Sequence, residues 1–476
     1  MHGSAGIARP RVTSMHSLRR TDFSSRKKGT SSTPVPAPVI RRRFGPFDLT
    51  LSAIVTVFVC GLCLSLAMVP PWQNPDEPQH MAGILTLAYP SQPDAALRVE
   101  REIVRSMADA DWWRHYGRVT PRPLPERLES VDSAQSRPLA AGIAYYEAMA
   151  LLVRALPFRG AAARLYLVRT CSAVFGVLAL FCCWAAARCC LGPAAATVTT
   201  AVLALNPQFA IVATTASPDA MVNLCGAYLW WQTCRLTREP HARGALLRAW
   251  AAAACCAMTR RIGLLLLPIA AVVSAVAVTA AFRRSRREGW TMAAGGVAAV
   301  AAVGILAFAL PGRVVDVAVG AIALTISAPY LDRLTVEFFG QFTGTLLDSA
   351  WLNGGWMRLP APRFWLNLMH ALTAVSVLGV LLELRRPSSQ RRVLVTALSL
   401  VAVPTVAIYA YYFTAMVGPT ARYLFPVAGP LTVLFLRGLA RWLPETRQQA
   451  LATCLIGLLA LFDAVAWAVV LVPAYL

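Results

Sequence analysis

The sequence predicts an all-α, polytopic integral membrane protein with about eleven transmembrane helices, and three observations support this fold class. Of its 476 residues, 57% are hydrophobic and only 14% are charged, and the mean hydropathy is +0.55. Soluble domains of this length do not normally reach such values. Apolar runs long enough to cross a bilayer recur along the chain. Arginines gather in every second short loop, as is typical of loops that stay in the cytoplasm.

Ten apolar runs have the length needed to cross about 30 Å of hydrocarbon, and one shorter run brings the count to about eleven. They are residues 47–69, 165–187, 194–214, 219–237, 262–282, 290–311, 365–384, 393–413, 420–438 and 450–472, with 245–258 as the shorter run. The half-apolar stretch 139–158 is expected to be an amphipathic helix on the outer surface. One more span at that place would move every later loop to the opposite side of the membrane.

The arginines also predict the orientation. If the basic segment 1–46 is cytoplasmic, the Arg-rich short loops all fall on the same side, which obeys the positive-inside rule. The C-terminus is then extracytoplasmic, and residues 70–164 and 312–364 form two large outer loops that carry amphipathic helices. The chain therefore divides into a disordered basic arm, 1–46, and a transmembrane domain, 47–476. Arg greatly outnumbers Lys, which suggests a high-GC bacterial genome and hence the bacterial inner membrane.

The charge and the cysteines exclude several classes of function. The formal net charge is +22, but its cations lie mostly in the short loops and the basic arm, so we expect membrane lipids and no nucleic acid as partners. All twelve cysteines lie in or at the ends of apolar runs. They are expected to be packing residues and not a disulfide framework or a zinc site.

An acidic cluster follows directly on the first apolar run. The segment 70–80 carries Asp76, Glu77 and His80 just outside the membrane, where charge tends to mark a functional site. Helix capping is the competing interpretation, with Asn74 as the N-cap, and it accounts for Glu77 better than for Asp76. Asp76 and His80 are spaced to share a helix face. A divalent metal bound by Asp76, Glu77 and His80 is one alternative, and a His80 that only orients Asp76 is the other.

Further polar residues are predicted to converge on the outer face. The candidates are Asp219, Arg260, Arg261, Trp356, Arg422 and Tyr423. An unpaired cation within the membrane costs about 2.5–3.5 kcal/mol, so the adjacent pair of arginines needs a phosphate or carboxylate partner or must snorkel to the surface. Asp219 could instead cap a helix, Arg422 and Tyr423 could anchor the chain at the interface, and Trp356 could belong to an aromatic belt or stack against a sugar ring.

Several motifs together resemble a known family. They are the Pro-Pro-x-x-x-Pro-Asp-Glu-Pro-x-His segment at 70–80, Asn206-Pro207-Gln208, Ser217-Pro218-Asp219-Ala220, Thr259-Arg260-Arg261, the segment 354–360 and the segment 421–426. In this order they are similar to a bacterial membrane-protein family of unknown function that is related to the GT-C glycosyltransferases, the class of the protein mannosyltransferases and the aminoarabinose transferase. The resemblance covers residues 47–440. The class often has His-Pro-Pro-Leu where this chain has Ser136-Arg137-Pro138-Leu139.

The resemblance implies an inverting glycosyltransferase that takes a sugar from a polyprenyl-phosphate donor. It implies Asp76 or Glu77 as the base, Asp219 as a second acid, and Arg260 and Arg422 near the donor phosphate. The acceptor is then a cell-envelope glycan, lipid or protein, with His80, Arg261, Trp356 and Tyr423 completing the substrate site.

The chemistry agrees with this expectation. A lipid phosphate is already stable as an anion when it leaves, so the reaction needs cations and one base but no general acid. A desolvated carboxylate is expected to have the raised pKa that suits a base. A flippase of lipid-linked saccharides and a non-catalytic scaffold for envelope assembly are the rival functions. The charged residues cluster on one face and no internal repeat is visible, which favours the enzyme over a transporter.

Overall fold

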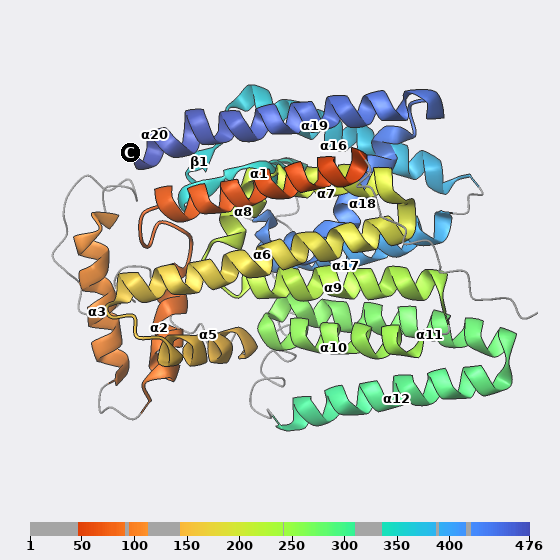
Figure 1. Cartoon of the computed structure of the whole chain (residues 1–476), viewed down its shortest axis with the longest axis horizontal. Coiled ribbons are helices and arrows are strands. Elements are labelled where there is room, and N and C mark those ends of the chain that lie inside the picture. Colours follow the sequence, from red (N-terminus) through yellow and green to blue (C-terminus); the bar gives the residue numbers. More distant parts are fainter. Residues whose placement is uncertain are drawn as a thin grey trace, which may run out of the picture. The chain divides into compact units, whose positions relative to one another are not determined.

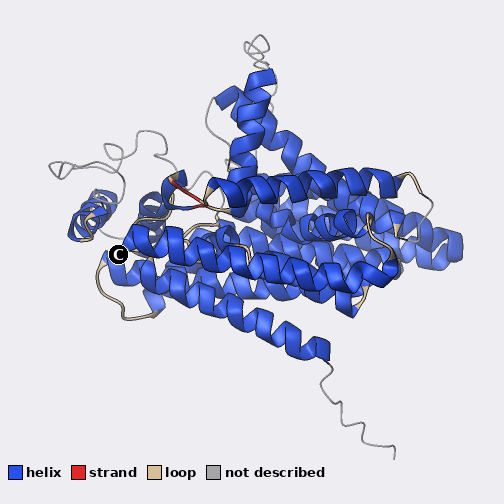
Figure 2. Cartoon of the chain, turned by 90° about the horizontal axis from the view of Figure 1, so that it is seen from above, coloured by secondary structure: helices blue, strands red, loops and turns tan. Residues whose placement is uncertain are grey.

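The computed structural model describes residues 46–90, 95–112, 143–240, 242–309, 336–386, 390–415 and 420–476. All of them lie in one compact unit, Phe44–Leu476. The predicted basic arm lies outside the described residues apart from Pro46. The described part is helical except for turns, loops and one two-residue strand, β1 (Leu359–Pro360), which forms isolated bridges with Asn353 and Gly354 (Figure 2). The predicted all-α class is confirmed for this part of the chain.

The long helices follow the predicted apolar runs. They are α1 (Pro46–Met68), α6 (Ala161–Leu191), α9 (Asp219–Arg238), α10 (Arg243–Thr259), α11 (Leu266–Arg284), α12 (Arg286–Ala309), α16 (Arg363–Leu384), α17 (Arg391–Ala415), α18 (Ala428–Ala440) and α19 (Gln448–Val465). A π-helical turn, η7 (Ala466–Leu471), continues α19 into α20 (Val472–Tyr475). Short connections make neighbours such as α9 and α10, or α11 and α12, lie side by side (Figure 1).

Three shorter helices from the loop 70–164, which is predicted to be the first outer loop, gather near the start of α6 (Figure 1). They are α2 (Glu77–Ala88), α3 (Ala95–Asp109) and α5 (Ala144–Ala155). Helix α5 falls in the stretch that was predicted to lie on the membrane surface. Its 12 residues span only about 18 Å, which is too short to cross the hydrocarbon. The connecting residues 113–142, including the Ser-Arg-Pro-Leu segment, lie outside the described residues.

One predicted span is broken. The run 194–214 forms α7 (Pro193–Ala204) and α8 (Pro207–Ala213), whose axes are bent by 70°. Pro207 cannot continue a preceding helix, and the Asn206 side chain caps α8 by accepting a hydrogen bond from the Phe209 amide at 3.0 Å. The side-chain amide of Asn206 also donates a hydrogen bond to the Ala350 carbonyl at 2.9 Å. The break therefore anchors the segment that is predicted to be the second outer loop.

The described part of that loop consists of α14 (Val336–Trp351), α15 (Gly354–Met357) and β1. The Asn353 amide donates to the Gln208 side chain at 2.8 Å, and the Ala421 amide donates to the Ser349 hydroxyl at 2.9 Å. The loop is thus fixed both to α8 and to the 3-10 helix η5 (Ala421–Val427), which leads into α18. A second short 3-10 helix, η3 (Arg261–Leu265), separates α10 from α11.

The chain is a multi-pass integral membrane protein. Among the described residues, seven helices are long and apolar enough to span a membrane, or eight if α7 and α8 form one span. The predicted count was about eleven. The difference lies in α9, which carries many polar residues, in α10, which has 17 residues, and in α12, which ends where the described segment ends. Seven or eight helices are therefore candidate spans by length and composition, and the eleven-span topology stays a prediction.

Candidate active site

Four charged side chains from distant parts of the sequence meet at the ends of four helical segments. Asp76 precedes α2, Asp219 begins α9, Arg260 follows α10, and Arg422 lies in η5. One Nη of Arg422 donates to Asp76 Oδ2 at 2.5 Å, Arg260 pairs with Asp219, and Arg422 Nε lies 3.9 Å from Asp219 Oδ2. The two carboxylate residues are only 4% and 2% exposed. We call these four residues the ionic cluster.

Tyr423 brings the two guanidinium groups of the ionic cluster together. The Cζ atoms of Arg260 and Arg422 lie 4.7 and 5.1 Å from the centre of the Tyr423 ring, which is the geometry of a cation–π contact. The Tyr423 hydroxyl accepts a hydrogen bond from Arg422 at 3.1 Å. Five of the residues predicted from the sequence therefore lie within one buried site.

The backbone presents Asp76 to Arg422 in an unusual conformation. Its φ is 65°, in the left-handed region, which Asp tolerates better than most residues with a Cβ. Asp76 is the N-cap residue of α2, but its side chain makes no capping hydrogen bond. The carboxylate is thus available to the ionic cluster. The sequence interpretation that placed the N-cap at Asn74 is wrong by two residues, because α2 begins only at Glu77.

The turn after α10 positions Arg260. Helix α10 ends at Thr259, and Arg260 takes an extended conformation with φ −156° and ψ 148°. The chain then folds back so tightly that a Cβ on Gly263 would lie 2.1 Å from the Cys256 carbonyl oxygen. Only glycine fits this approach. The side chain of the neighbouring candidate Arg261 is not among those that the structure describes, and the same holds for Trp356.

The electrostatics of Asp76 differ from the sequence expectation. Burial acts to raise the pKa of Asp76, but the Arg422 guanidinium, together with Arg260, brings it below its ordinary value. The expected raised pKa is therefore wrong for this arrangement, because the sequence did not show that a cation bonds the carboxylate directly. Asp76 is ionised at neutral pH.

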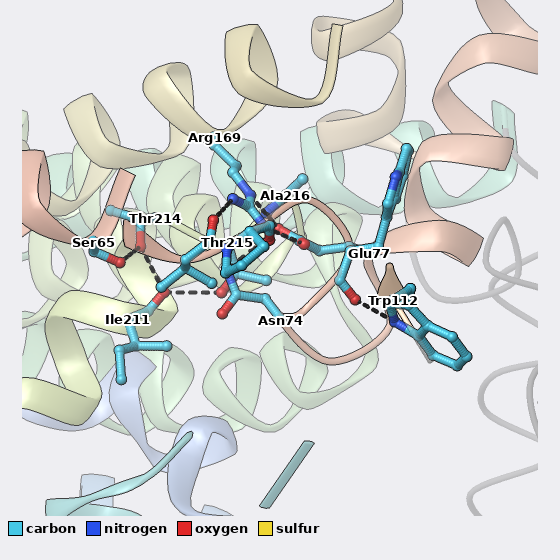
Figure 3. A network of polar contacts seen from close by, with 12 residues as sticks. Ser65, Asn74, Glu77, Trp112, Arg169, Ile211, Thr214, Thr215 and Ala216 are labelled. Atoms are coloured by element: carbon cyan, nitrogen blue, oxygen red, sulfur yellow. Dashed lines mark hydrogen bonds and ion pairs between the residues drawn. The ribbon is translucent and has the colours of Figure 1, made fainter. Parts of the chain in front are cut away.

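Glu77 belongs to a different network. Its side chain is fully buried and binds both Nε and one Nη of Arg169, at 2.8 and 2.6 Å. It also accepts hydrogen bonds from the Ala216 amide at 3.1 Å and from Asn74 at 3.4 Å. Arg169 in turn donates to the carbonyls of Val69 and Pro70. Figure 3 shows this network between α6, the first loop and the turn before α9.

His80 lies one helical turn after Asp76. Its Nδ1 is 2.7 Å from the Tyr146 hydroxyl of α5, and burial lowers the pKa of His80 to about 4. Burial also raises the pKa of Tyr146. Both side chains are therefore neutral at physiological pH.

The alternative of a metal bound by Asp76, Glu77 and His80 is not supported by the geometry. Within the described ranges, no group of three or more His, Cys, Asp and Glu side chains is placed to hold a metal ion. The physical reason is the direction of the side chains: Glu77 bonds Arg169, whereas Asp76 bonds Arg422.

Sequence reasoning missed Arg169 and Tyr146. Arg169 had a signal, since an arginine inside an apolar run marks a site by default, and the run 165–187 contains it. Tyr146 had none, because nothing local distinguishes a tyrosine on an amphipathic helix from a packing residue.

Residues 161–308 match the sequence model of a family described as dolichyl-phosphate-mannose-protein mannosyltransferase. The matched segment runs from the first residue of α6 nearly to the end of α12, and it includes Asp219 and Arg260 of the ionic cluster. The predicted resemblance to the protein mannosyltransferase class of GT-C proteins is confirmed over this segment.

Among solved structures, the chain is similar to ArnT from Cupriavidus metallidurans bound to undecaprenyl phosphate, with 17% identity, 85% of this chain and 62% of that chain covered, and a TM-score of 0.45. It is also similar to the oligosaccharyltransferase AglB from Archaeoglobus fulgidus in complex with an inhibitory peptide and a dolichol-phosphate, with 13% identity, 87% and 56% covered, and a TM-score of 0.44. The chain thus spans less than two thirds of the length of either protein. The search of curated proteins gave no match.

Proposed function

We propose that the protein is a GT-C type membrane glycosyltransferase that moves a sugar from a polyprenyl-phosphate donor to a hydroxyl of an extracytoplasmic glycan, lipid or protein. The observation that carries this proposal is the ionic cluster, in which two carboxylates and two guanidinium groups are buried together in a membrane protein. The family match supports it, because the family's description names a sugar on a lipid phosphate.

The arginines of the cluster suit the donor phosphate. Arg422 Nε has no hydrogen-bond partner among the described residues, so Arg422 keeps a donor for a further ligand. The planar guanidinium offers two parallel hydrogen bonds to phosphate oxygens. Arg260 and Arg422 both contact the ring of Tyr423. Together they would hold the charge that develops on the phosphate as the sugar leaves.

Asp76 is the proposed base. While it binds Arg422, its lowered pKa makes it a weak base. A donor phosphate that takes over Arg422 would weaken this ion pair and raise the basicity of the carboxylate. The acceptor oxygen then attacks the anomeric carbon, its proton passes to Asp76, and the bond from the anomeric carbon to the phosphate oxygen breaks. A single displacement of this kind inverts the anomeric centre.

Asp219 is proposed as the second acid. It holds Arg260 by an ion pair at the start of α9, where a carboxylate is also stabilised by the positive end of the helix dipole. Arg261 and Trp356 stay proposed substrate-binding residues. Glu77 is better explained as a structural partner of Arg169, because its carboxylate accepts hydrogen bonds from Arg169, Asn74 and the Ala216 amide.

The test is sugar transfer by the full-length protein in proteoliposomes that contain lipid-linked sugars and membrane acceptor extract. Asp76→Asn removes the base and keeps both side-chain size and tolerance of a left-handed backbone. We expect transfer to fall at least 100-fold, in keeping with loss of a general base, while donor binding persists. The matched control is Asp109→Asn, an exposed residue of the same outer loop.

Other outcomes identify the rival functions. Unchanged transfer in Asp76→Asn would remove Asp76 as the base. Movement of the donor across the bilayer without sugar transfer would indicate a flippase. If the wild type neither binds the donor nor transfers the sugar, the scaffold function remains. The same assay with a chelator tests for a divalent metal, since loss of transfer that Mg²⁺ or Mn²⁺ restores would assign one.

A further inference from the structure

Two buried neutral side chains lie one helical turn beyond the two carboxylates of the ionic cluster. The His80 amide donates a hydrogen bond to the carbonyl of Asp76 at 3.0 Å, at the start of α2. Asn223 follows Asp219 by four residues within α9, so these two share a helix face. His80 is 6% exposed and Asn223 is 2% exposed. Neither His80 Nε2 nor either polar atom of the Asn223 side chain has a hydrogen-bond partner in the described part of the chain.

Contacts on both sides of Asn223 direct it toward η5. Asp219, one turn before it, lies 3.9 Å from Arg422 of η5. Gly226, one turn after it on the same stripe, approaches η5 so closely that a Cβ there would lie 2.1 Å from the Pro426 carbonyl oxygen. The stripe of α9 that contains Asn223 therefore faces the segment that carries Arg422 and Tyr423.

His80 is held by Tyr146 and lies within electrostatic range of the ionic cluster. The Tyr146 hydroxyl fixes Nδ1 at 2.7 Å, so the ring presents Nε2 to the remaining side. The charged residues that act on His80 are Asp76, Arg260, Asp219 and Arg422, the four members of the ionic cluster. Leaving three buried polar atoms unpaired is costly for a folded protein, so each of them calls for a hydrogen-bond partner.

We propose that His80 and Asn223 form a neutral subsite that binds hydroxyl groups of the donor sugar, next to the phosphate held by the ionic cluster. This inference deepens the proposed function and rests on it. A hydroxyl both donates and accepts hydrogen bonds, so it pairs with either tautomer of His80 and with both atoms of the Asn223 amide. A phosphate oxygen only accepts, and the Asn223 carbonyl oxygen would repel it.

The test compares two probes, undecaprenyl phosphate alone and a panel of undecaprenyl-phosphate-linked hexoses and pentoses, by affinity for the purified full-length protein in nanodiscs. The ratio of the two dissociation constants isolates the contribution of the sugar. We expect Asn223→Leu and His80→Phe each to reduce the sugar-dependent gain about tenfold, as for loss of one or two hydrogen bonds. Their affinity for undecaprenyl phosphate should be unchanged.

Thermal unfolding without ligand separates a binding role from a structural one. Because Asn223 has no hydrogen-bond partner among the described residues, Asn223→Leu should leave the melting temperature unchanged or raise it. The matched control is Gln232→Leu on the same helix, where the side chain is buried and accepts from Arg248 at 3.4 Å. It should lower the melting temperature and keep the sugar-dependent ratio.

Three results would overturn the proposed subsite. A sugar-dependent gain in the wild type that both variants keep would overturn the subsite and leave the proposed function intact. A panel on which the wild type shows no gain for any sugar would overturn the subsite and the proposed donor together. Loss of affinity for undecaprenyl phosphate itself would also overturn it, by assigning these residues to the phosphate.

Discussion

At the scale of a single residue, the buried His80 is expected to make the stability of the protein depend on pH. Burial lowers its pKa to about 4, whereas in the unfolded chain histidine titrates near 6.5. Between these values the unfolded chain binds a proton that the folded chain does not, so stability falls as the pH drops from about 6.5 toward 4. The full effect is on the order of 3 kcal/mol. The stability from the lowered pKa of Asp76 is lost only at lower pH, below its ordinary value.

The measurement is the melting temperature of the detergent-solubilised protein at pH 7.5, 6, 5 and 4.5, for the wild type and His80→Gln. We expect the wild type to lose stability steadily over this range and the variant to lose less. Parallel curves for the two proteins would show that His80 is not buried in its neutral form.

The sequence identified the individual candidate residues, but it did not identify their ion-pair partners. Asp76, Asp219, Arg260 and Arg422 stand out as charges at the ends of apolar runs. Their pairing joins positions that are far apart in the chain, such as Asp76 and Arg422, and it depends on how α9, α10 and η5 pack. The direction of the pKa shift of Asp76 followed from this pairing, which explains why the sequence expectation failed.

At the scale of elements, the network of Glu77 and Arg169 holds the segment between α1 and α2. Arg169 of α6 binds the carbonyls at the end of α1, and Glu77 at the start of α2 binds the amide before α9. The adjoining residue of the chain is Asp76. The network therefore fixes the loop that carries the proposed base. Glu77 affects the site indirectly, because it holds the neighbouring Asp76 in place.

Glu77→Gln should destabilise the protein strongly. It keeps the shape of the side chain but leaves the buried cation of Arg169 without its counter-charge, and breaking a buried pair in this way costs about 3–5 kcal/mol. Thermal and chemical unfolding in detergent measure the loss. The matched control is Glu102→Gln, whose ion pair with Arg164 is long and half-exposed and should contribute less than about 1 kcal/mol. Equal effects of the two variants would contradict the structural role of Glu77.

The sequence predicted the positions of the helices better than their continuity. Hydrophobic runs located the long helices to within a few residues, because an apolar stretch in a membrane protein has no alternative to a helix. The break between α7 and α8 escaped this reasoning, since Pro207 and Asn206 lie within a run that is apolar as a whole. Its cause is tertiary, because Asn206 and Gln208 bind the second outer loop.

At the scale of the whole described unit, the number of spans decides which loops share a side of the membrane. The eleven-span topology counts α9, α10 and α12 as crossing, whereas the eight-span count leaves them out. Helix α9 is polar but buried among its neighbours, and a helix shielded from lipid can cross with polar side chains facing the protein interior. Figure 1 places the turn between α11 and α12 at the opposite end from α2, α3 and α5.

Fusions of alkaline phosphatase and green fluorescent protein after Glu239 and after Arg386 test this topology. Both points follow Arg-rich helix ends, so the positive-inside rule and eleven spans place both in the cytoplasm. We expect fluorescence and no phosphatase activity at both points, and phosphatase activity at the C-terminus. With only eight spans, phosphatase would be active after Glu239 and after Arg386. That result would place the Arg-rich loops outside the cytoplasm and would overturn the eleven-span topology.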